Sequence, residues 1–186
     1  MKMKTKIFYL VALFMCTMVM GVFTSCSKSD DKADTPSTPD TTPATAQVTY
    51  LAEVTKDMSD NMVITVDYYD ANGNMQTETL SGLLTWTKTL TFKIPCKVAA
   101  RLNFKAKDGV DYSTFDKLSV GGYVSHIAAM YNKAGVLLKD FNFTVSWNTM
   151  DVPGKNIEKY ITEKGTGYKS FLYNYDEKGN KTEGSW

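Results

Sequence analysis

Apolar and polar residues alternate along several runs of the chain after residue 47. In the run 97–107, KVAARLNFKAK, every second residue from Val98 to Ala106 is apolar, and most residues between them are polar. A period of two is typical of a strand that buries one face and leaves the other in water. The same pattern, with many β-branched and aromatic residues, predicts further strands in the runs that begin at Val48, Met62, Thr89, Tyr123, Phe141 and Ser170.

One turn pattern occurs three times between these runs: YYDANGN from Tyr68, MYNKAGV from Met130 and YNYDEKGN from Tyr173. Each has an aromatic residue, then Asp or Asn, two further residues and Gly. An Asp or Asn that bonds back to its own backbone favours a type I turn, and Gly at the last position can close a bulged hairpin. A calcium loop of the EF-hand kind needs Gly in the sixth place, whereas Gly73 is fourth from Asp70. The pattern therefore predicts three β-hairpins and no metal site.

Only the segment GKNIEKYITEKG has a helical pattern. Ile157, Tyr160 and Ile161 recur at i, i+3 and i+4, which predicts a short helix over residues 155–164. A strand is the alternative, because Ile157 and Ile161 would also share one face of a strand.

Many short strands, repeated hairpin signals and one short helix indicate an all-β fold. We expect an antiparallel β-sandwich of about seven or more strands in an immunoglobulin-like arrangement. With Trp86 opening a strand, the stretch 47–140 resembles the small membrane-anchored β-sandwich domains of bacterial envelopes, which combine an Asn-Gly hairpin with a Trp-led strand. The remaining stretch to Trp186 would add a C-terminal hairpin. A lipocalin-like barrel is the alternative, because it also suits many up-and-down strands.

The N-terminal end has the layout of a secretory signal. Lysines at positions 2, 4 and 6 precede the uncharged apolar run 7–23, and small residues follow it. The stretch FTSC resembles the lipobox of bacterial lipoproteins, although Phe23 stands where that pattern usually has Leu. The resemblance implies that residues 1–25 are a signal peptide and that Cys26 is acylated and anchors the protein to a membrane. An uncleaved membrane helix is the alternative, because 17 apolar residues are at the short limit for crossing a bilayer.

Residues 26–46 are rich in Thr, Pro, Asp and Ala and lack large apolar side chains, which is typical of a linker. The first part, SKSDDK, resembles the export tag of surface lipoproteins of the Bacteroidota, and the resemblance implies the outer face of the outer membrane. A plain solvated tether is the alternative. Asp40-Thr41-Thr42 resembles a short O-glycosylation site of Bacteroidota envelope proteins, with Thr41 as the modified residue. Residues 47–186 then form the sandwich domain.

The charge of the chain does not favour nucleic acid as a partner. Removal of the three signal lysines takes the formal net charge from +1 to −2, and the linker accounts for that −2. The domain is then neutral overall and lacks the broad positive field that non-specific nucleic-acid binding requires. Because Cys16 leaves with the signal and Cys26 is acylated, Cys96 is the remaining thiol, and we expect no intramolecular disulfide.

The sequence contains no catalytic motif that we recognise. The domain has one histidine, His126, which the pattern places on a strand face with Val124 and Ala128 as a structural or interface residue. Phosphate loops, nucleophile elbows and HExxH motifs are absent from the sequence. Two carboxylates are all that a glycosidase needs, so five acidic residues are candidates for such a pair. They lie in turn-like, solvated stretches: Asp57, Asp60, Asp108, Asp111 and Asp116. We therefore expect neither an enzyme nor a cofactor.

The anchor, the linker and the many aromatic residues favour a lipid-anchored recognition module of the cell envelope. We expect it to bind a glycan or a protein without catalysis. The candidates for stacking against a ligand are Tyr112, Tyr123, Tyr168 and Trp186, with core or cross-strand packing as the alternative for each. Two other functions are compatible with the sequence: a structural or adhesive subunit whose sheet edge pairs with another chain, and a periplasm-facing accessory lipoprotein of an envelope complex.

Overall fold

The computed structural model describes residues 39–80, 82–142 and 148–186, which form two antiparallel sheets of five strands each. The first sheet contains β1 (Thr45–Val54), β4 (Thr85–Lys93), β6 (Lys117–Tyr131), β7 (Leu137–Asn142) and β8 (Thr149–Pro153). The second contains β2 (Met62–Tyr69), β3 (Met75–Thr79), β5 (Cys96–Ala106), β9 (Lys169–Tyr175) and β10 (Lys181–Glu183). The all-β antiparallel sandwich expected from the sequence is confirmed, and the described strands form two sheets rather than the alternative closed barrel.

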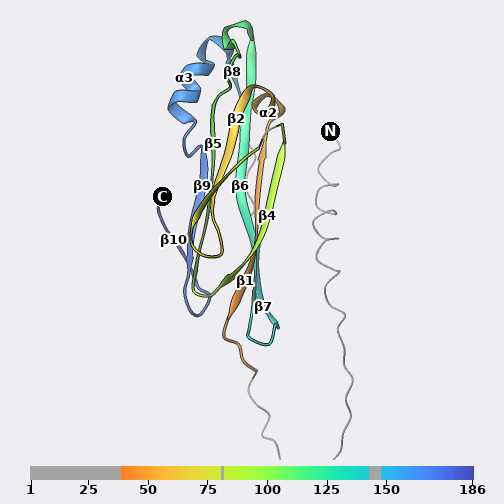
Figure 1. Cartoon of the computed structure of the whole chain (residues 1–186), viewed down its shortest axis with the longest axis vertical. Coiled ribbons are helices and arrows are strands. Elements are labelled where there is room, and N and C mark those ends of the chain that lie inside the picture. The colour runs from red at the N-terminus through yellow and green to blue at the C-terminus, as the bar shows by residue number, and fades with distance from the viewer. Residues whose placement is uncertain (1–38, 81, 143–147) are drawn as a thin grey trace, which may run out of the picture. The chain divides into compact units, whose positions relative to one another are not determined.

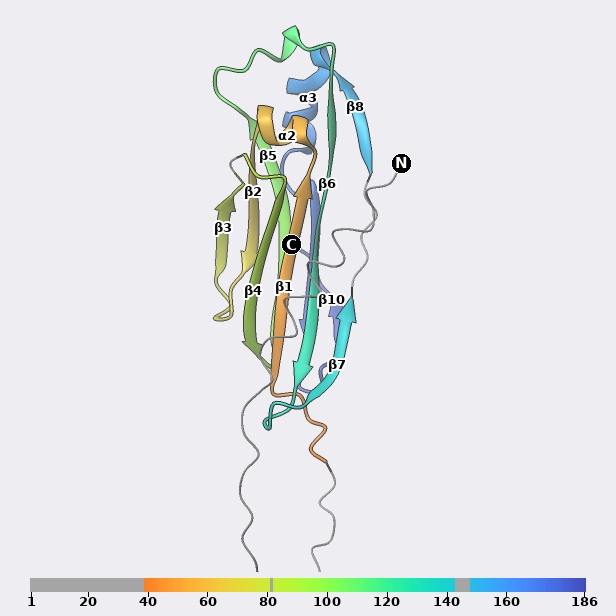
Figure 2. The same cartoon turned by 90° about the vertical axis from the view of Figure 1, so that its right-hand side faces the viewer.

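The strand order is β4-β1-β6-β7 in the first sheet and β10-β9-β5-β2-β3 in the second (Figures 1 and 2). The long strand β6 pairs with β8 along its first part and with β7 along its last part. Three helical segments lie in connections that pass from one sheet to the other: α2 (Lys56–Asn61), α3 (Gly154–Lys164) and the 3-10 turn η1 (Tyr112–Thr114). Both views show these segments gathered at one end of the sandwich.

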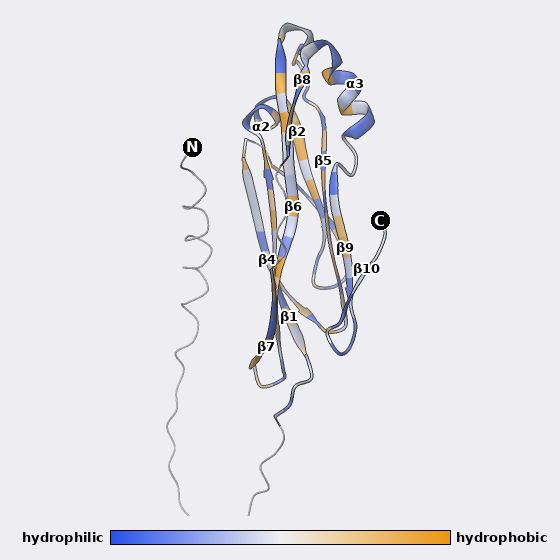
Figure 3. Ribbon diagram, turned by 180° about the vertical axis from the view of Figure 1, so that it is seen from behind, coloured by the Kyte–Doolittle hydropathy of each residue, from blue (hydrophilic) through white to orange (hydrophobic). Residues whose placement is uncertain are grey.

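The core between the sheets is strongly aromatic. Tyr50 of β1 is fully buried, and its ring lies 5.6 Å from that of Tyr68 and 6.3 Å from that of Phe171, measured between ring centroids. The hydroxyl of Tyr50 donates to the carbonyl oxygen of Tyr69 at 2.9 Å, so this ring is buried without an unsatisfied polar atom. Apolar and polar residues alternate along the strands, as the sequence predicts (Figure 3). Val98, Leu102 and Phe104 of β5 face the core.

The three predicted hairpins are confirmed and share one geometry. They join β2 to β3, β6 to β7 and β9 to β10, and they begin at Asp70, Asn132 and Asp176. In each, the Oδ1 atom of the first residue accepts two backbone N–H groups, two and four residues later, at 2.8 to 3.0 Å. The fourth residue is Gly with φ between 70° and 79°, a conformation that other residues rarely adopt.

The segment that leads into β1 lies beside two of these hairpins. The side-chain amide of Asn132 donates to the carbonyl oxygen of Asp40 at 2.7 Å, and the amide of Ala44 donates to Tyr131. A Cβ atom on Gly179 would lie 3.1 Å from Pro43. The chain therefore enters the sandwich at the end opposite the helical segments, as Figure 2 shows.

The helix expected over residues 155–164 is confirmed as α3, which buries Ile157 and Ile161 against the sandwich. The short helix α2 was not predicted. Its N-cap is Thr55, whose hydroxyl oxygen accepts the amide of Met58 at 3.3 Å. One turn and a half is too short to produce a helical period in the sequence, so Asp57 and Asp60 were placed in a turn.

The strand predictions hold with changes at their ends. β1 starts at Thr45, and β6 starts at Lys117, six residues before the predicted run at Tyr123. Gly121 and Gly122 interrupt the alternation of apolar and polar residues there. Both positions favour glycine, because a Cβ atom on either residue would lie under 3.0 Å from a backbone oxygen of a neighbouring segment. Of the predicted run 141–147, residues 143–147 lie outside the described residues.

Candidate functional site

Trp186 lies on the outer face of the second sheet and is held there by three contacts. Its ring centroid lies 4.7 Å from the guanidinium carbon of Arg101 and 6.1 Å from the ring of Tyr69. Its indole N–H donates to the carbonyl oxygen of Phe171 at 3.2 Å. The side chain is nevertheless 41% exposed, which is unusual for so large an apolar residue that is also fixed in place. Trp186 is therefore an ordered aromatic surface that a ligand can reach.

Arg101 is positioned by a buried carboxylate. Asp67 of β2 accepts hydrogen bonds from Arg101 Nε at 2.8 Å, Thr77 Oγ1 at 2.7 Å and Asn103 Nδ2 at 3.0 Å. Burial by itself raises the pKa of Asp67, but these hydrogen bonds outweigh it and hold the pKa below its usual value. Arg101 uses only Nε for this contact, so the two terminal amino groups of its guanidinium are available as donors beside the Trp186 ring.

A second ring with a cation over it lies further along the same face. Tyr69 ends β2, and the Lys97 ammonium lies 4.8 Å from its ring centroid. Lys97 precedes Arg101 by four residues on β5, so the two side chains point to the same side of the sheet. The outer face thus presents Tyr69 and Trp186 as aromatic rings, with Lys97 and Arg101 beside them.

A groove of about 440 Å³ continues from Trp186 along β9. Its lining comes from Val124, from residues 169–173 of β9 and from the tail 183–186. β10 pairs only with the last three residues of β9, so among the described residues the earlier part of β9 has β5 on one side and no strand on the other. The groove lies along this open side. The tail then crosses Leu172 at Gly184, where a Cβ atom would lie 2.2 Å from Leu172 Cδ2.

His126 lies behind the groove wall in the core. Its ring lies 4.7 Å from that of Phe171 and 5.3 Å from that of Tyr173, and Nε2 is 3.1 Å from the Tyr175 hydroxyl. The residue is 1% exposed. Burial, and then the nearby positive charge of Lys181, lower the pKa of His126 to about 4, so the ring is neutral at pH 7. In this position His126 supports the aromatic wall and does not reach the groove surface.

The structure places the four predicted stacking residues in different environments. Tyr112 is 2% exposed, and its hydroxyl donates to Asn61 and accepts the amide of Lys107. This ring faces no solvent, so the stacking prediction is wrong for Tyr112. Tyr168 is half-buried with its edge against Phe104 at 5.1 Å, and it immediately precedes the groove residue Lys169. Tyr123 is half-buried in β6, next to the groove residue Val124.

Tyr69 and Phe171 were not singled out from the sequence. The period-two pattern indicates which face a strand residue occupies, but it does not show which strands are neighbours. The contact of Tyr69 with Trp186 joins β2 to the C-terminal tail, so no local signal could have revealed it.

Thr41, the predicted O-glycosylation residue, is exposed, and Asp40 Oδ1 accepts the amide of Thr42 beside it at 2.9 Å. Cys26, the predicted lipidation residue, lies outside the described residues. Among the described residues, no helix has the length and apolar character needed to span a membrane.

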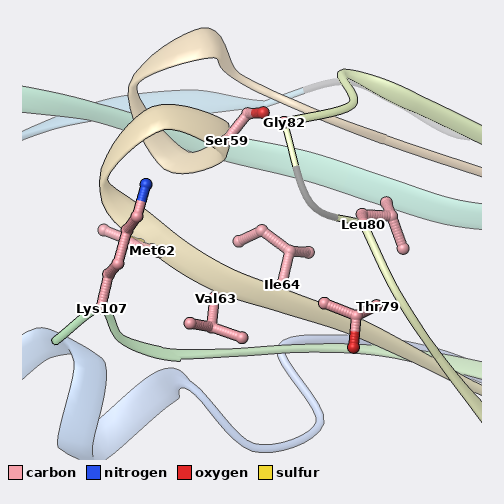
Figure 4. Close-up of a pocket in the computed structure, with 8 residues that line it drawn as sticks. All are labelled: Ser59, Met62, Val63, Ile64, Thr79, Leu80, Gly82 and Lys107. Atoms are coloured by element: carbon pink, nitrogen blue, oxygen red, sulfur yellow. The ribbon is translucent and has the colours of Figure 1, made fainter.

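A second, smaller cavity of about 110 Å³ lies near the helical end (Figure 4). Ser59 of α2, Lys107 after β5, and a set of mostly apolar residues from β2, β3 and the connection after β3 line it. The Lys107 ammonium already donates to the carbonyl oxygen of Asp60 at 2.8 Å. A benzene-sized ligand needs a cavity of about 150 Å³. This cavity is too small to be the main binding site.

Three of the five acidic residues that could form a catalytic pair have structural partners. Asp57 accepts the amide of Ser119 at 2.7 Å, Asp60 pairs with Lys56, and Asp111 accepts the amide of Ser113 at 3.0 Å. Burial raises the pKa of the Cys96 thiol to about 11, so it is not a thiolate at neutral pH. The described part of the chain contains no group of three or more His, Cys, Asp or Glu side chains placed to hold a metal ion.

Comparison with models of known protein families and with curated proteins found no match. The geometry of the site is therefore the basis on which a function is inferred. Fixed aromatic faces, an Arg with free donors and an adjoining groove suit non-covalent binding of a flat ring that carries polar groups at its edge.

Proposed function

We propose that this protein is a lipid-anchored lipoprotein of the bacterial outer membrane, displayed at the cell surface, whose sandwich is a non-catalytic recognition module for glycans. The observation that carries the binding role is Trp186, an exposed aromatic ring held between Arg101, Tyr69 and the mouth of the groove. A sugar ring has an apolar face that can stack on an aromatic residue and hydroxyl groups that accept from an Arg. The N-terminal resemblance to bacterial lipoproteins supports the anchor at Cys26, and the linker supports display away from the membrane.

Replacement of Trp186 by Ala tests the binding role. We expect the Trp186→Ala variant to lose about tenfold or more in affinity for a polysaccharide that the parent protein binds, because the largest stacking surface is removed. Binding of the purified protein to immobilised polysaccharides, measured by surface plasmon resonance, checks this. Leu83→Ala is the matched control, since Leu83 is 53% exposed and lies in the connection before β4, away from the groove. Equal affinities of parent and Trp186→Ala would contradict the proposed site.

A second candidate function, a self-associating structural subunit, is favoured by strand β4. In the described structure β4 lies at an open edge, and its nine residues pair with β1 without a register shift. The other described edges are protected in ways typical of natural proteins: β3 and β10 are short, β7 follows a register shift, and β8 ends in Pro153. β4 therefore offers the longest regular edge to a second copy of the chain.

An inward-pointing charge on an edge strand usually prevents such pairing, and Lys88 points inward on β4. Here Lys88 lies 2.8 Å from Glu78 of β3, whose other oxygen accepts the Trp86 indole N–H at 2.7 Å. Hydrogen bonds from Lys88, Trp86 and Tyr68 hold the pKa of Glu78 at about 2, so its charge persists and neutralises Lys88. Antiparallel pairing of two β4 strands about Thr89 would place Trp86 opposite Phe92 and no like charges face to face.

Sedimentation equilibrium of two charge variants tests this second candidate. Thr89→Lys places two lysines directly opposite at the symmetry axis, and we expect it to weaken dimerisation about tenfold or more. Thr91→Lys adds the same charge opposite Thr87 and should weaken it less. A parent protein that stays monomeric at all accessible concentrations would contradict the hypothesis of a self-associating subunit.

A further inference from the structure

We propose that the glycan bound at this site is acidic, a sugar chain that carries carboxylate or sulfate groups. This inference rests on the proposed function and deepens it by naming the ligand class. The observation behind it is that three rings in or beside the site have a cation over them. Trp186 has Arg101 at 4.7 Å, Tyr69 has Lys97 at 4.8 Å, and Tyr168 has Lys169 at 5.2 Å from the ring centroid.

A cation over an aromatic ring keeps its charge and its outward N–H donors. A ligand that reaches the edges of these three rings therefore meets positive charge at each of them. A neutral sugar would use the rings and hydroxyl contacts only, and it would displace water from the ammonium and guanidinium groups without compensating their charge. An acidic sugar supplies both a ring and the opposite charge.

Positively charged side chains at the site outnumber the carboxylates that could neutralise them. Among the described residues, neither Lys97 nor Lys169 takes part in an ion pair. Asp67 is already engaged by Arg101, and Glu183 is the carboxylate that lines the groove. On the outer face of β5, Lys97, Arg101 and Lys105 recur at every fourth residue, with Ala99 and Asn103 between them on the same face. The positive charge is local, because the domain as a whole is neutral.

The spacing of these groups requires an extended ligand. Lys97 and Arg101 are four residues apart on one strand, which corresponds to about 13 Å. Lys169 lines the groove on the neighbouring strand β9, where it pairs in register with Leu102. A single acidic sugar cannot reach all three cations, whereas a chain with repeated acidic groups can. The terminal amino groups of Arg101 suit two-point binding of a carboxylate or sulfate, and each Lys offers a point charge.

Binding to matched neutral and acidic polysaccharides tests the inference. The probes are dextran, dextran sulfate and polygalacturonate, measured with the purified protein at low and at high sodium chloride. We expect each acidic probe to bind at least about tenfold tighter than dextran at low salt, with the difference shrinking as salt screens the charges. The two acidic probes separate sulfate from carboxylate recognition.

The variant Lys97→Gln/Lys169→Gln should lose most of the preference for the acidic probes. Lys155→Gln/Lys164→Gln is the matched control, because it removes the same charge from exposed positions at either end of α3 and should keep the preference. Dextran binding that equals acidic binding and ignores salt would overturn the inference but leave the proposed function standing. Absence of binding to all three polysaccharides would overturn both. Equal binding of single-stranded RNA would show that charge alone is recognised, and this would also overturn the inference.

Discussion

The Gly154→Ala variant is expected to lose about 3 kcal/mol or more of its free energy of unfolding. Gly154 begins α3 and is buried, and its amide donates to the carbonyl oxygen of Asp116 at 3.0 Å. A Cβ atom there would lie 2.0 Å from the carbonyl oxygen of Phe115 and 2.7 Å from that of Tyr112. Both obstacles are backbone atoms, so the helix or the η1 segment has to move.

The η1 segment cannot move without further loss. The hydroxyl of Tyr112 donates to Asn61 at 2.6 Å and accepts the amide of Lys107 at 2.9 Å, which ties the segment to the ends of α2 and β5. Urea unfolding followed by circular dichroism measures the effect. Lys155→Ala is the control, because the next residue of α3 is exposed and its replacement should change the stability by no more than about 0.5 kcal/mol. Matching midpoints for Gly154→Ala and the parent would show that this close approach is absent in solution.

Because of His126, the free energy of unfolding is expected to fall by up to about 3 kcal/mol as the pH falls from 6.5 to 4. The folded pKa of about 4 is below the unfolded value of 6.5, so the unfolded chain binds the proton first. The stabilisation is therefore complete above pH 6.5 and is lost progressively down to pH 4. Phe171, Tyr173 and the Tyr175 hydroxyl contact the ring, and the nearby positive charge of Lys181 opposes its protonation.

The His126→Phe variant isolates this effect. It keeps an aromatic ring against Phe171 but removes the titrating group and the contact with the Tyr175 hydroxyl. We expect it to be about 1 kcal/mol less stable at pH 7 and to lose less stability than the parent between pH 6.5 and 4, where carboxylates with a lowered pKa, such as Glu78, still contribute. Urea midpoints at several pH values compare the two proteins. A parent protein whose stability is flat over that range would show that His126 is protonated or accessible in the folded state.

The sequence predicted local features better than distant contacts. The period of two in β5 and the Asp or Asn with Gly in each hairpin are set by neighbouring residues, so strands, hairpins and buried faces were predicted correctly. Strand order could not be predicted, since the first strand β1 lies between β4 and β6, and nothing local specifies these partners. The short helix α2 was not predicted, because its N-cap Thr55 ends the strand run that begins at Val48 and six residues are too few to give a helical period.

The candidate site was predicted only in part for the same reason. Trp186 was predicted from its residue type alone, and the structure adds Arg101, Tyr69 and the groove that give the ring a role. Tyr112 was misplaced because an aromatic residue after a polar loop looks exposed in the sequence. Its burial depends on hydroxyl partners at Asn61 and Lys107, and the bond to Asn61 joins residues far apart in the chain.

The shared hairpin geometry separates the residues that specify each turn from those that do not. In every hairpin the first residue and the Gly fix the backbone, while the two residues between them project from the turn: Ala71 and Asn72, Lys133 and Ala134, Glu177 and Lys178. These positions are open to substitution, including by cysteine. Because Cys96 is half-buried with a thiol pKa of about 11, a cysteine at Ala71 or Lys133 would react first with a maleimide. The fold thereby provides an attachment point for a spectroscopic probe on each sheet: Lys133 between β6 and β7 of the first, and Ala71 between β2 and β3 of the second.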